Sequence, residues 1–371
     1  MLLPVIELKK SAGIFCAADI FQHRMENNRR VSYSVKTKKI IITFLLIAAA
    51  VSLLSGCFGT GGSGGSEEEM QSGDIVSPDS AAEKLQIVCT VFPQYDFVRQ
   101  IAGDYADVSM LIRPGADVHH YEPAPQDIID VYECDLFIYA GGESEEWADR
   151  ILNAADSKGR RVISMLDCCE KAEEETEEGM WTPEFFGKDE HGEEETEYDE
   201  HVWTSLDNAS AIVCAIRDTL CEMDQTNAEI YRKNAEDYLQ KLSTLKESFQ
   251  NVVDNAQRKT IVFGDRFPLL YFVKEFGLEY KAAYRGCAAD SEAGAETVAY
   301  LIDYVSENEI PVVFRQDLSN GNIASVISEG TGAEVRIFYS CHNLSKEDFD
   351  NGETYLSLME KNLVRLKEAL N

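Results

Sequence analysis

Basic residues are scarce in this chain of 371 residues, which has 34 Lys and Arg against 66 Asp and Glu. The formal net charge is therefore −32. Because nucleic-acid binding depends on clustered Lys and Arg that neutralise phosphates, this balance argues against a nucleic-acid partner. An acidic surface suits a cation better, although acidity in general mainly serves solubility.

The apolar run near the N-terminus is too short for a membrane-spanning helix. It covers residues 40–54 and follows Lys36, Lys38 and Lys39, as in a signal peptide. It ends in residues 54–57 (LSGC), which resemble the lipobox of bacterial lipoproteins. We therefore expect a signal peptide over residues 1–56, with Met25 as a candidate start, and lipidation of Cys57. The alternative is an ordinary secretory signal with a chance Cys.

The ten cysteines include no Cys-x-x-Cys pair, so their spacing is not that of a zinc ribbon. Disulfides are allowed outside the cytoplasm. Cys287 and Cys341 lie in loop-like stretches and are the best candidates for a bridge. The alternative is that both are free, buried thiols.

The region after Cys57 is polar and contains a Gly/Ser-rich stretch, residues 59–65. Residues 57–84 therefore read as a flexible tether. From residue 85 onward, strand patterns (85–91, 107–112, 136–140, 161–165) alternate with helical patterns (95–102, 127–134, 145–154). This alternation predicts an N-terminal α/β lobe with a parallel sheet over residues 85–225.

An acidic insertion, residues 173–200, interrupts this lobe with fourteen Asp or Glu. Like charges repel, so a mobile, solvated loop is expected, with loose collection of cations as the alternative. Residues 226–257 contain no Pro or Gly. Their apolar side chains recur every three or four residues, which predicts one long, rigid helix that joins two lobes.

The alternation restarts after this helix. Strand patterns occur at 260–263, 278–283, 311–314 and 334–338, and helical patterns at 267–276, 294–308, 322–330 and 353–370. Gly277 and Gly330 are expected to end two of these helices. Residues 258–371 therefore form a second α/β lobe, and a ligand is expected in the cleft between the lobes.

Histidine is rare, with six in the chain, and three occupy positions where side chains meet a cleft. His119 lies on a loop that follows a strand, His201 opens a helix, and His342 follows the strand at 334–338. Zinc binds neutral imidazole in four-coordinate sites, so these three histidines are candidate ligands.

The chain resembles the metal-binding lipoproteins of bacterial ABC importers for zinc and manganese. Residues 113–123 (RPGADVHHYEP) resemble the family's Pro-Gly-x-Asp-Pro-His-x-Tyr-Glu-Pro, with His119 in the ligand position and His120 in a variable one. Residues 199–203 (DEHVW) resemble Asp-Pro-His-x-Trp, and residues 353–359 (ETYLSLM) resemble the closing helix.

Two departures from the family pattern affect the expected ligand set. The family's third histidine corresponds to Arg266, which stays protonated and cannot bind a metal. Its neighbour Asp265 is the candidate in its place, with a helix N-cap as the alternative role. His342 lies where the family has an acid, and this nitrogen donor favours zinc over manganese. Asp117 and Glu122 are candidates for orienting the imidazoles.

The resemblance implies a receptor that captures Zn²⁺, or less readily Mn²⁺, and delivers it to an ABC permease and its ATPase. Such a protein is a monomer, is not an enzyme, and is lipid-anchored on the outer face of the cytoplasmic membrane. The alternative is a zinc-dependent extracellular hydrolase, since three protein ligands plus water also form catalytic sites. The lack of a His-Glu-x-x-His motif argues against it. A role in cell adhesion, proposed for some relatives, is not addressed by the sequence.

Overall fold

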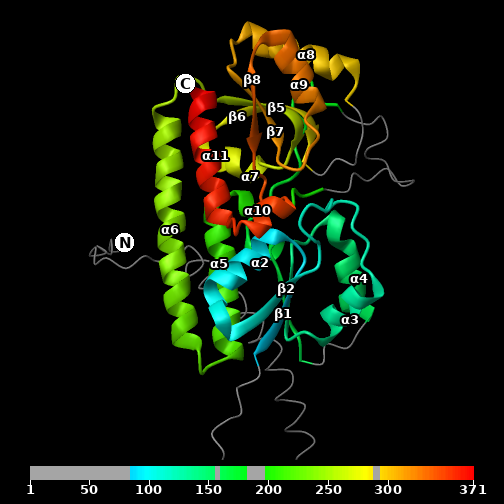
Figure 1. Cartoon of the computed structure of the whole chain (residues 1–371), viewed down its shortest axis with the longest axis vertical. Coiled ribbons are helices and arrows are strands. Elements are labelled where there is room, and N and C mark those ends of the chain that lie inside the picture. Colours follow the sequence, from blue (N-terminus) through cyan, green and yellow to red (C-terminus); the bar gives the residue numbers. More distant parts are fainter. Residues whose placement is uncertain (1–83, 155–158, 182–196, 287–292) are drawn as a thin grey trace, which may run out of the picture. The chain divides into compact units, whose positions relative to one another are not determined.

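Two parallel four-stranded sheets organise the part of the chain that the computed structural model describes, residues 84–154, 159–181, 197–286 and 293–371 (Figure 1). The first sheet has the order β2-β1-β3-β4 and the second β6-β5-β7-β8. Their bounds are β1 Leu85–Cys89, β2 Ala106–Met110, β3 Leu136–Tyr139, β4 Arg161–Ser164, β5 Thr260–Phe267, β6 Glu279–Arg285, β7 Val312–Gln316 and β8 Glu334–Phe338. The prediction of two α/β lobes with parallel sheets is confirmed. The predicted signal peptide, Cys57 and tether lie outside the described residues.

Both faces of each sheet are buried, which explains the continuous apolar strands in the sequence. In β1, Ile87 and Cys89 face one core cluster, whereas Val88 faces another. In β5, Phe263 faces the same cluster as Ile87, whereas Val262 faces a third cluster on the other side of the second sheet. Helices cover the faces: α2 Phe92–Ala102, α3 Pro125–Glu133, α4 Glu146–Ala154 and α5 Leu206–Met223 in the first lobe, and α7 Leu270–Phe276, α8 Ala295–Glu307, α9 Asn322–Thr331 and α11 Tyr355–Leu370 in the second. The short helix α10, Lys346–Asp350, lies between β8 and α11 in the chain.

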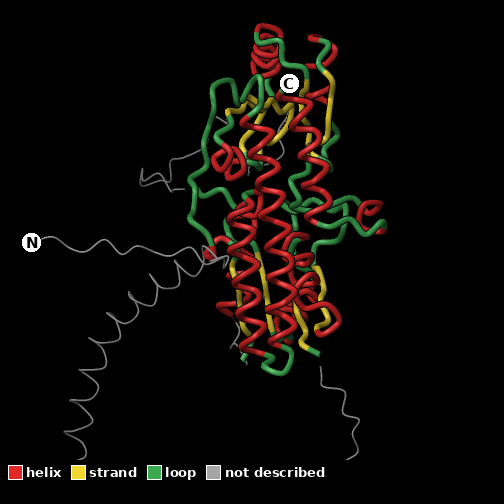
Figure 2. Tube along the Cα trace, turned by 90° about the vertical axis from the view of Figure 1, so that its left-hand side faces the viewer, coloured by secondary structure: helices red, strands yellow, loops and turns green. Residues whose placement is uncertain are grey.

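The long helix α6, Ala228–Asp254, packs against both lobes. It contacts α2 and α5 of the first lobe and α7 and α11 of the second. Figure 2 shows long helices that lie beside the strands of both sheets. The buried residues of α6 recur every three or four positions from Tyr231 to Val253, as predicted.

One apolar core cluster runs through both lobes behind the cleft. It contains Ile138 from the first sheet and Phe314 from the second, with Tyr238 and Leu242 of α6. Because the interior of this cluster is shared, the lobes are joined by packing as well as by the chain.

Local differences from the sequence prediction occur at element ends. Helix α2 begins at Phe92, because Pro93 fits the first turn of a helix. Strand β5 continues to Phe267, four residues beyond the prediction, so the next helix begins later, at Leu270. Helix α9 extends past Gly330 and ends at Gly332, whose φ of 80° suits a left-handed cap.

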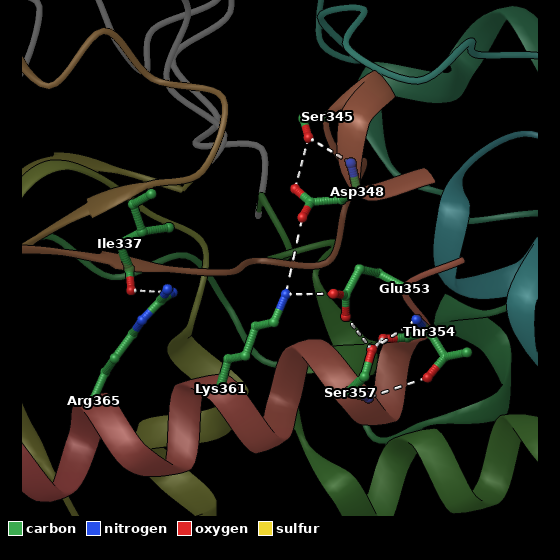
Figure 3. Close-up of polar contacts among 8 residues, drawn as sticks. All are labelled: Ile337, Ser345, Asp348, Glu353, Thr354, Ser357, Lys361 and Arg365. Atoms are coloured by element: carbon green, nitrogen blue, oxygen red, sulfur yellow. Dashed lines mark hydrogen bonds and ion pairs between the residues drawn. The ribbon is translucent and has the colours of Figure 1, made fainter. Parts of the chain in front are cut away.

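The chain that follows β8 is tied down by polar contacts (Figure 3). Ser345 caps α10 by accepting the backbone N–H of Asp348 at 3.0 Å. Lys361 of α11 reaches Glu353 at 2.6 Å and Asp348 at 3.9 Å. These contacts hold the short segment between β8 and α11 in a defined position.

Candidate metal centre

The loop between β2 and α3 presents His119, and Asp117 organises this loop. The Asp117 Oδ1 atom accepts the backbone N–H of His119 at 3.0 Å, and its Oδ2 atom lies 3.2 Å from His120 Nδ1. Gly115 precedes them with a φ of 82°, a conformation in which glycine is favoured. His119 is partly buried, whereas His120 is exposed. The two neighbouring histidines therefore have different surroundings.

His201 is held by Asp199. The carboxylate Oδ1 atom accepts the backbone N–H of His201 at 2.7 Å and lies 3.1 Å from its Nδ1 atom. A proton on Nδ1 leaves the lone pair of Nε2 available, and this buried Nε2 atom has no hydrogen-bond partner. Burial alone would lower the pKa of His201, but the carboxylates of Asp199 and Glu200 outweigh burial and raise it.

His342 belongs to the loop that follows β8 in the second lobe, and it is 5% exposed. Its backbone N–H donates to Ser340 Oγ at 3.2 Å, and its carbonyl accepts the N–H of Phe92 at 3.3 Å. The indole ring of Trp203 lies 4.8 Å from the imidazole ring, centroid to centroid.

The three histidines converge, although they come from distant parts of the chain. Candidate ligand atoms of His119, His201 and His342 all lie within 4.8 Å of one another. Burial, followed by the charges of His201 and Arg266, lowers the pKa of His119 to about 3. Burial also lowers the pKa of His342 well below its usual range. Both imidazoles are therefore neutral at pH 7, the form in which imidazole binds a metal.

Hydrogen bonds between the lobes hold together the loops that carry His119 and His342. Asn343 Nδ2 donates to the carbonyls of Arg113 and Ala116, each at 2.9 Å. The N–H of Gly115 donates to the carbonyl of Leu344 at 2.8 Å. The loop that carries His342 is thus attached directly to the loop that carries His119.

Asp265 is not part of the histidine group in the described structure. It lies within β5 and not at a helix start, so its alternative role as a helix N-cap is wrong; the residue before α7 is Leu269. Its Oδ1 atom accepts the N–H of Arg266 at 2.9 Å, and its Oδ2 atom accepts the N–H of Gln316 at 3.1 Å. The extension of β5 to Phe267 fixes Asp265 in this position.

Cys341 is a buried free thiol, so the structure does not support the bridge expected with Cys287, which itself lies outside the described residues. The Cys341 side chain is 0% exposed within the shared core, at a φ of 57°. Cys341 therefore packs as a small apolar side chain in this core.

Both ends of the acidic insertion pack against the second lobe, in contrast to the solvated loop expected from the sequence. Lys281 pairs with Glu177 at 3.1 Å, and Arg285 pairs with Glu197 at 2.9 Å. The N–H of Trp181 donates to the carbonyl of Ala283 at 2.9 Å. Basic residues of β6 thus offset part of the charge of the insertion; its residues 182–196 lie outside the described ones.

A cavity of about 610 Å³ opens beside the histidine group. His119 and His342 line it, together with Arg266, Asp265 and other polar residues.

No role was predicted from the sequence for Asp199 or Asn343. The position of Asp199, two residues before a candidate ligand, could have indicated that it orients His201. Asp117 orients the backbone of its loop, and no contact places Glu122 at an imidazole among those described.

Comparisons with known proteins identify the family of this chain. The model of a family described as zinc-uptake complex component A, periplasmic (ZnuA), matches residues 87–369. The chain belongs to this family. The zinc-binding lipoprotein AdcA of Streptococcus pneumoniae is 32% identical over 292 residues, which cover 77% of this chain and 56% of the relative. This chain therefore spans about half the length of that relative.

A second relative, and the solved structure of one domain of AdcA, match over nearly their whole length. The high-affinity zinc uptake protein ZnuA of Bacillus subtilis is 30% identical over 302 residues, which cover 79% of this chain and 90% of the relative. The crystal structure of the Zn(II)-bound ZnuA-like domain of S. pneumoniae AdcA has a TM-score of 0.64 and 30% identity, and the match covers 78% of this chain and 99% of that domain. No helix within the described parts of the chain is long and apolar enough to cross a membrane.

Proposed function

We propose that this protein is the extracytoplasmic receptor of an ABC importer, which binds Zn²⁺ and delivers it to a membrane permease and its ATPase. The observation that carries the proposal is the convergence of His119, His201 and His342, whose candidate ligand atoms lie within 4.8 Å of one another. Zinc-binding relatives of the same family support it.

The donor set favours zinc over manganese. Three imidazole nitrogens suit zinc, whereas manganese prefers carboxylate oxygens. No carboxylate within the described ranges joins the histidine group, and Asp265 is engaged with backbone N–H groups. Zinc is the cargo here and not a resident cofactor, so the proposal requires tight, reversible binding and no chemical step.

The proposal places the protein on the outer face of the cytoplasmic membrane. Lipidation of Cys57 would anchor it, and residues 57–84 would form the tether. We propose further that it acts as a monomer and is not an enzyme. The zinc-dependent hydrolase remains the competing function, because three ligands plus water also occur in catalytic sites.

Zinc titration of the metal-free protein tests this function. We expect one tight zinc equivalent and weaker manganese binding. His119→Ala, His201→Ala and His342→Ala should each weaken zinc binding roughly 100-fold or more, because each removes a ligand. His120→Ala is the matched control and should bind zinc like the unchanged protein, because His120 is exposed and pairs with Asp117.

Two results would contradict the proposal. Equal zinc affinity in all four variants would show that the histidine group is not the metal site. Hydrolytic turnover that requires zinc and is lost in His119→Ala would favour the hydrolase.

A further inference from the structure

The two ends of the acidic insertion run side by side where they leave and re-enter the first lobe. An antiparallel bridge and backbone hydrogen bonds of 2.9 and 3.0 Å join residues 172–174 to residues 197–199. We call these two short segments the stem of the insertion. His201 follows only two residues after Asp199, the last residue of the stem. A displacement of the stem is therefore passed on to His201 over a very short stretch of chain.

Tyr271, on α7 of the second lobe, binds both segments of the stem through one hydroxyl group. The hydroxyl donates to the carbonyl of Asp199 at 2.8 Å and accepts the N–H of Ala172 at 3.0 Å. The side chain of Tyr271 is only 6% exposed. Removal of a buried partner leaves the remaining polar groups without a hydrogen bond, at a cost in free energy. The second lobe thus holds the stem of the insertion in a fixed position.

The end of β6 also lies against the stem. Arg285 pairs with Glu197 at 2.9 Å, although a partly exposed ion pair contributes little to stability. A Cβ atom at Gly286 would lie 3.4 Å from the Oδ2 atom of Asp199, so the chain after β6 approaches this carboxylate closely. The second lobe therefore surrounds Asp199, and the hydroxyl group of Tyr271 makes the buried, directional contact with its backbone.

Asp199 connects the Tyr271 hydrogen bond to the histidine group. Its Oδ1 atom accepts the backbone N–H of His201 at 2.7 Å and lies 3.1 Å from His201 Nδ1. Because the carbonyl and the carboxylate belong to one residue, a hydrogen bond that fixes the carbonyl also restrains the carboxylate. Metal ligands need to be held within about 10–20° of their productive orientation. The direction of the His201 Nε2 lone pair therefore depends on a hydroxyl group of the other lobe.

We propose that Tyr271 is a positioning residue of the zinc site, which acts through Asp199 to hold the imidazole of His201 in place beside His119 and His342. This inference rests on the proposed function, because it concerns a ligand of the zinc ion. It makes His201, which follows the chain of the first lobe, dependent on α7 of the second lobe for its orientation.

Calorimetric zinc titrations of the purified full chain at pH 7.5 test the inference. Tyr271→Phe removes the hydroxyl group and leaves the ring. We expect the zinc dissociation constant to rise about tenfold, the lower end of the range for groups that orient metal ligands. Tyr231→Phe is the matched control, because it removes a buried tyrosine hydroxyl that also makes a hydrogen bond of 2.8 Å, to Asp224 between α5 and α6. The zinc affinity of this control should not change.

Two further measurements distinguish positioning from general stabilisation. With Co²⁺ in place of zinc, the visible absorption bands report the geometry of the ligands. These bands should change in Tyr271→Phe and stay the same in Tyr231→Phe. In a double-mutant cycle, Asp199→Ala should weaken zinc binding by itself. Adding Tyr271→Phe to Asp199→Ala should then cause little further loss, because two residues that act as one unit do not have additive effects.

Two outcomes would overturn the inference. If Tyr271→Phe lowers the thermal stability but leaves the zinc affinity and the cobalt spectrum unchanged, the hydroxyl group serves folding alone. If the losses in the double-mutant cycle are fully additive, Tyr271 does not act through Asp199. In both cases, tight zinc binding that is lost in His201→Ala leaves the receptor function standing. Failure of the unchanged protein to bind zinc contradicts that function itself.

Discussion

At the scale of single residues, the buried carboxyl groups of Asp199 and Glu145 have different electrostatic effects. Asp199 is hydrogen-bonded to His201 and favours positive charge there. Glu145 is 3% exposed, and its Oε2 atom accepts the N–H groups of Ala140 and Gly141 at 2.6 and 3.1 Å. Burial raises the pKa of Glu145 to about 7 from the ordinary value of 4.5, and the nearby charge of Glu200 adds to this rise.

We predict that Glu145 makes the metal-free protein less stable as the pH rises. The folded protein retains the proton of this carboxyl up to about pH 7, whereas the unfolded chain releases it near 4.5. Because the unfolded chain binds fewer protons in this window, the free energy of unfolding decreases through it, by about 3 kcal/mol for this group. Urea unfolding in EDTA at pH 5 and pH 8 should show a smaller decrease for Glu145→Gln.

Glu146→Gln is the control for this experiment, because Glu146 is an exposed neighbour paired with Arg150. Its stability should follow the pH profile of the unchanged protein. Parallel profiles for Glu145→Gln and the unchanged protein would show that Glu145 ionises with its ordinary pKa in the folded state.

At the scale of elements, contacts between loops position His119 and His342 relative to each other. The His119 loop and the His342 loop belong to different lobes, yet Asn343 links them by two hydrogen bonds of 2.9 Å. Ser345 and the α10–α11 contacts hold the downstream side of the same loop (Figure 3). The relative position of His119 and His342 is therefore set by side-chain hydrogen bonds and ion pairs between and beside these loops.

We predict that Asn343→Ala weakens zinc binding although Asn343 does not belong to the histidine group. Loss of two partly buried hydrogen bonds leaves the carbonyls of Arg113 and Ala116 without this donor, at a cost of about 1–3 kcal/mol. If this loss destabilises the zinc-bound state and not the metal-free state, the zinc dissociation constant should rise about 5- to 100-fold in a calorimetric titration.

Asn351→Ala serves as the control, because Asn351 is an exposed residue at the end of α10. Its zinc affinity should not change. An unchanged zinc affinity in Asn343→Ala would show instead that the three histidines keep their arrangement without the link between the loops.

At the scale of the whole described unit, the shared core joins the two lobes. Ile138, Phe314 and Tyr238 belong to one cluster of buried residues, and α6 contacts helices of both lobes. Large hinge motions would separate packed surfaces in this core. The structure therefore favours small movements of loops over wide opening of the cleft.

We predict a single calorimetric unfolding transition for both lobes, which zinc shifts to higher temperature as a whole. At a free zinc concentration 1,000 times the dissociation constant, binding to the folded state stabilises it by about 4 kcal/mol. The shift should be much smaller in His119→Ala, because a site that is 100-fold weaker leaves only about 1.4 kcal/mol of this stabilisation, and it should be unchanged in His120→Ala. Two transitions, of which zinc shifts only one, would mean that the lobes unfold independently.

The sequence by itself determined much of the architecture and the choice of candidate metal donors. Strands and helices leave periodic patterns over a few residues, because each side chain's burial follows the local geometry of the backbone. This is why the two parallel lobes and α6 could be predicted. His119, His201 and His342 could be named because they are rare residues at the ends of such patterns.

Only the tertiary structure decided which of these residues meet. The convergence of three histidines depends on contacts between segments far apart in the chain, such as the link from Asn343 to Arg113. The positions of Asp265 and Arg266 could not be predicted from the sequence either. Because β5 continues through both residues, the Asp265 carboxylate accepts backbone N–H groups and Arg266 lines the cavity. Pairing with neighbouring strands, which no local pattern records, fixed the direction of these side chains.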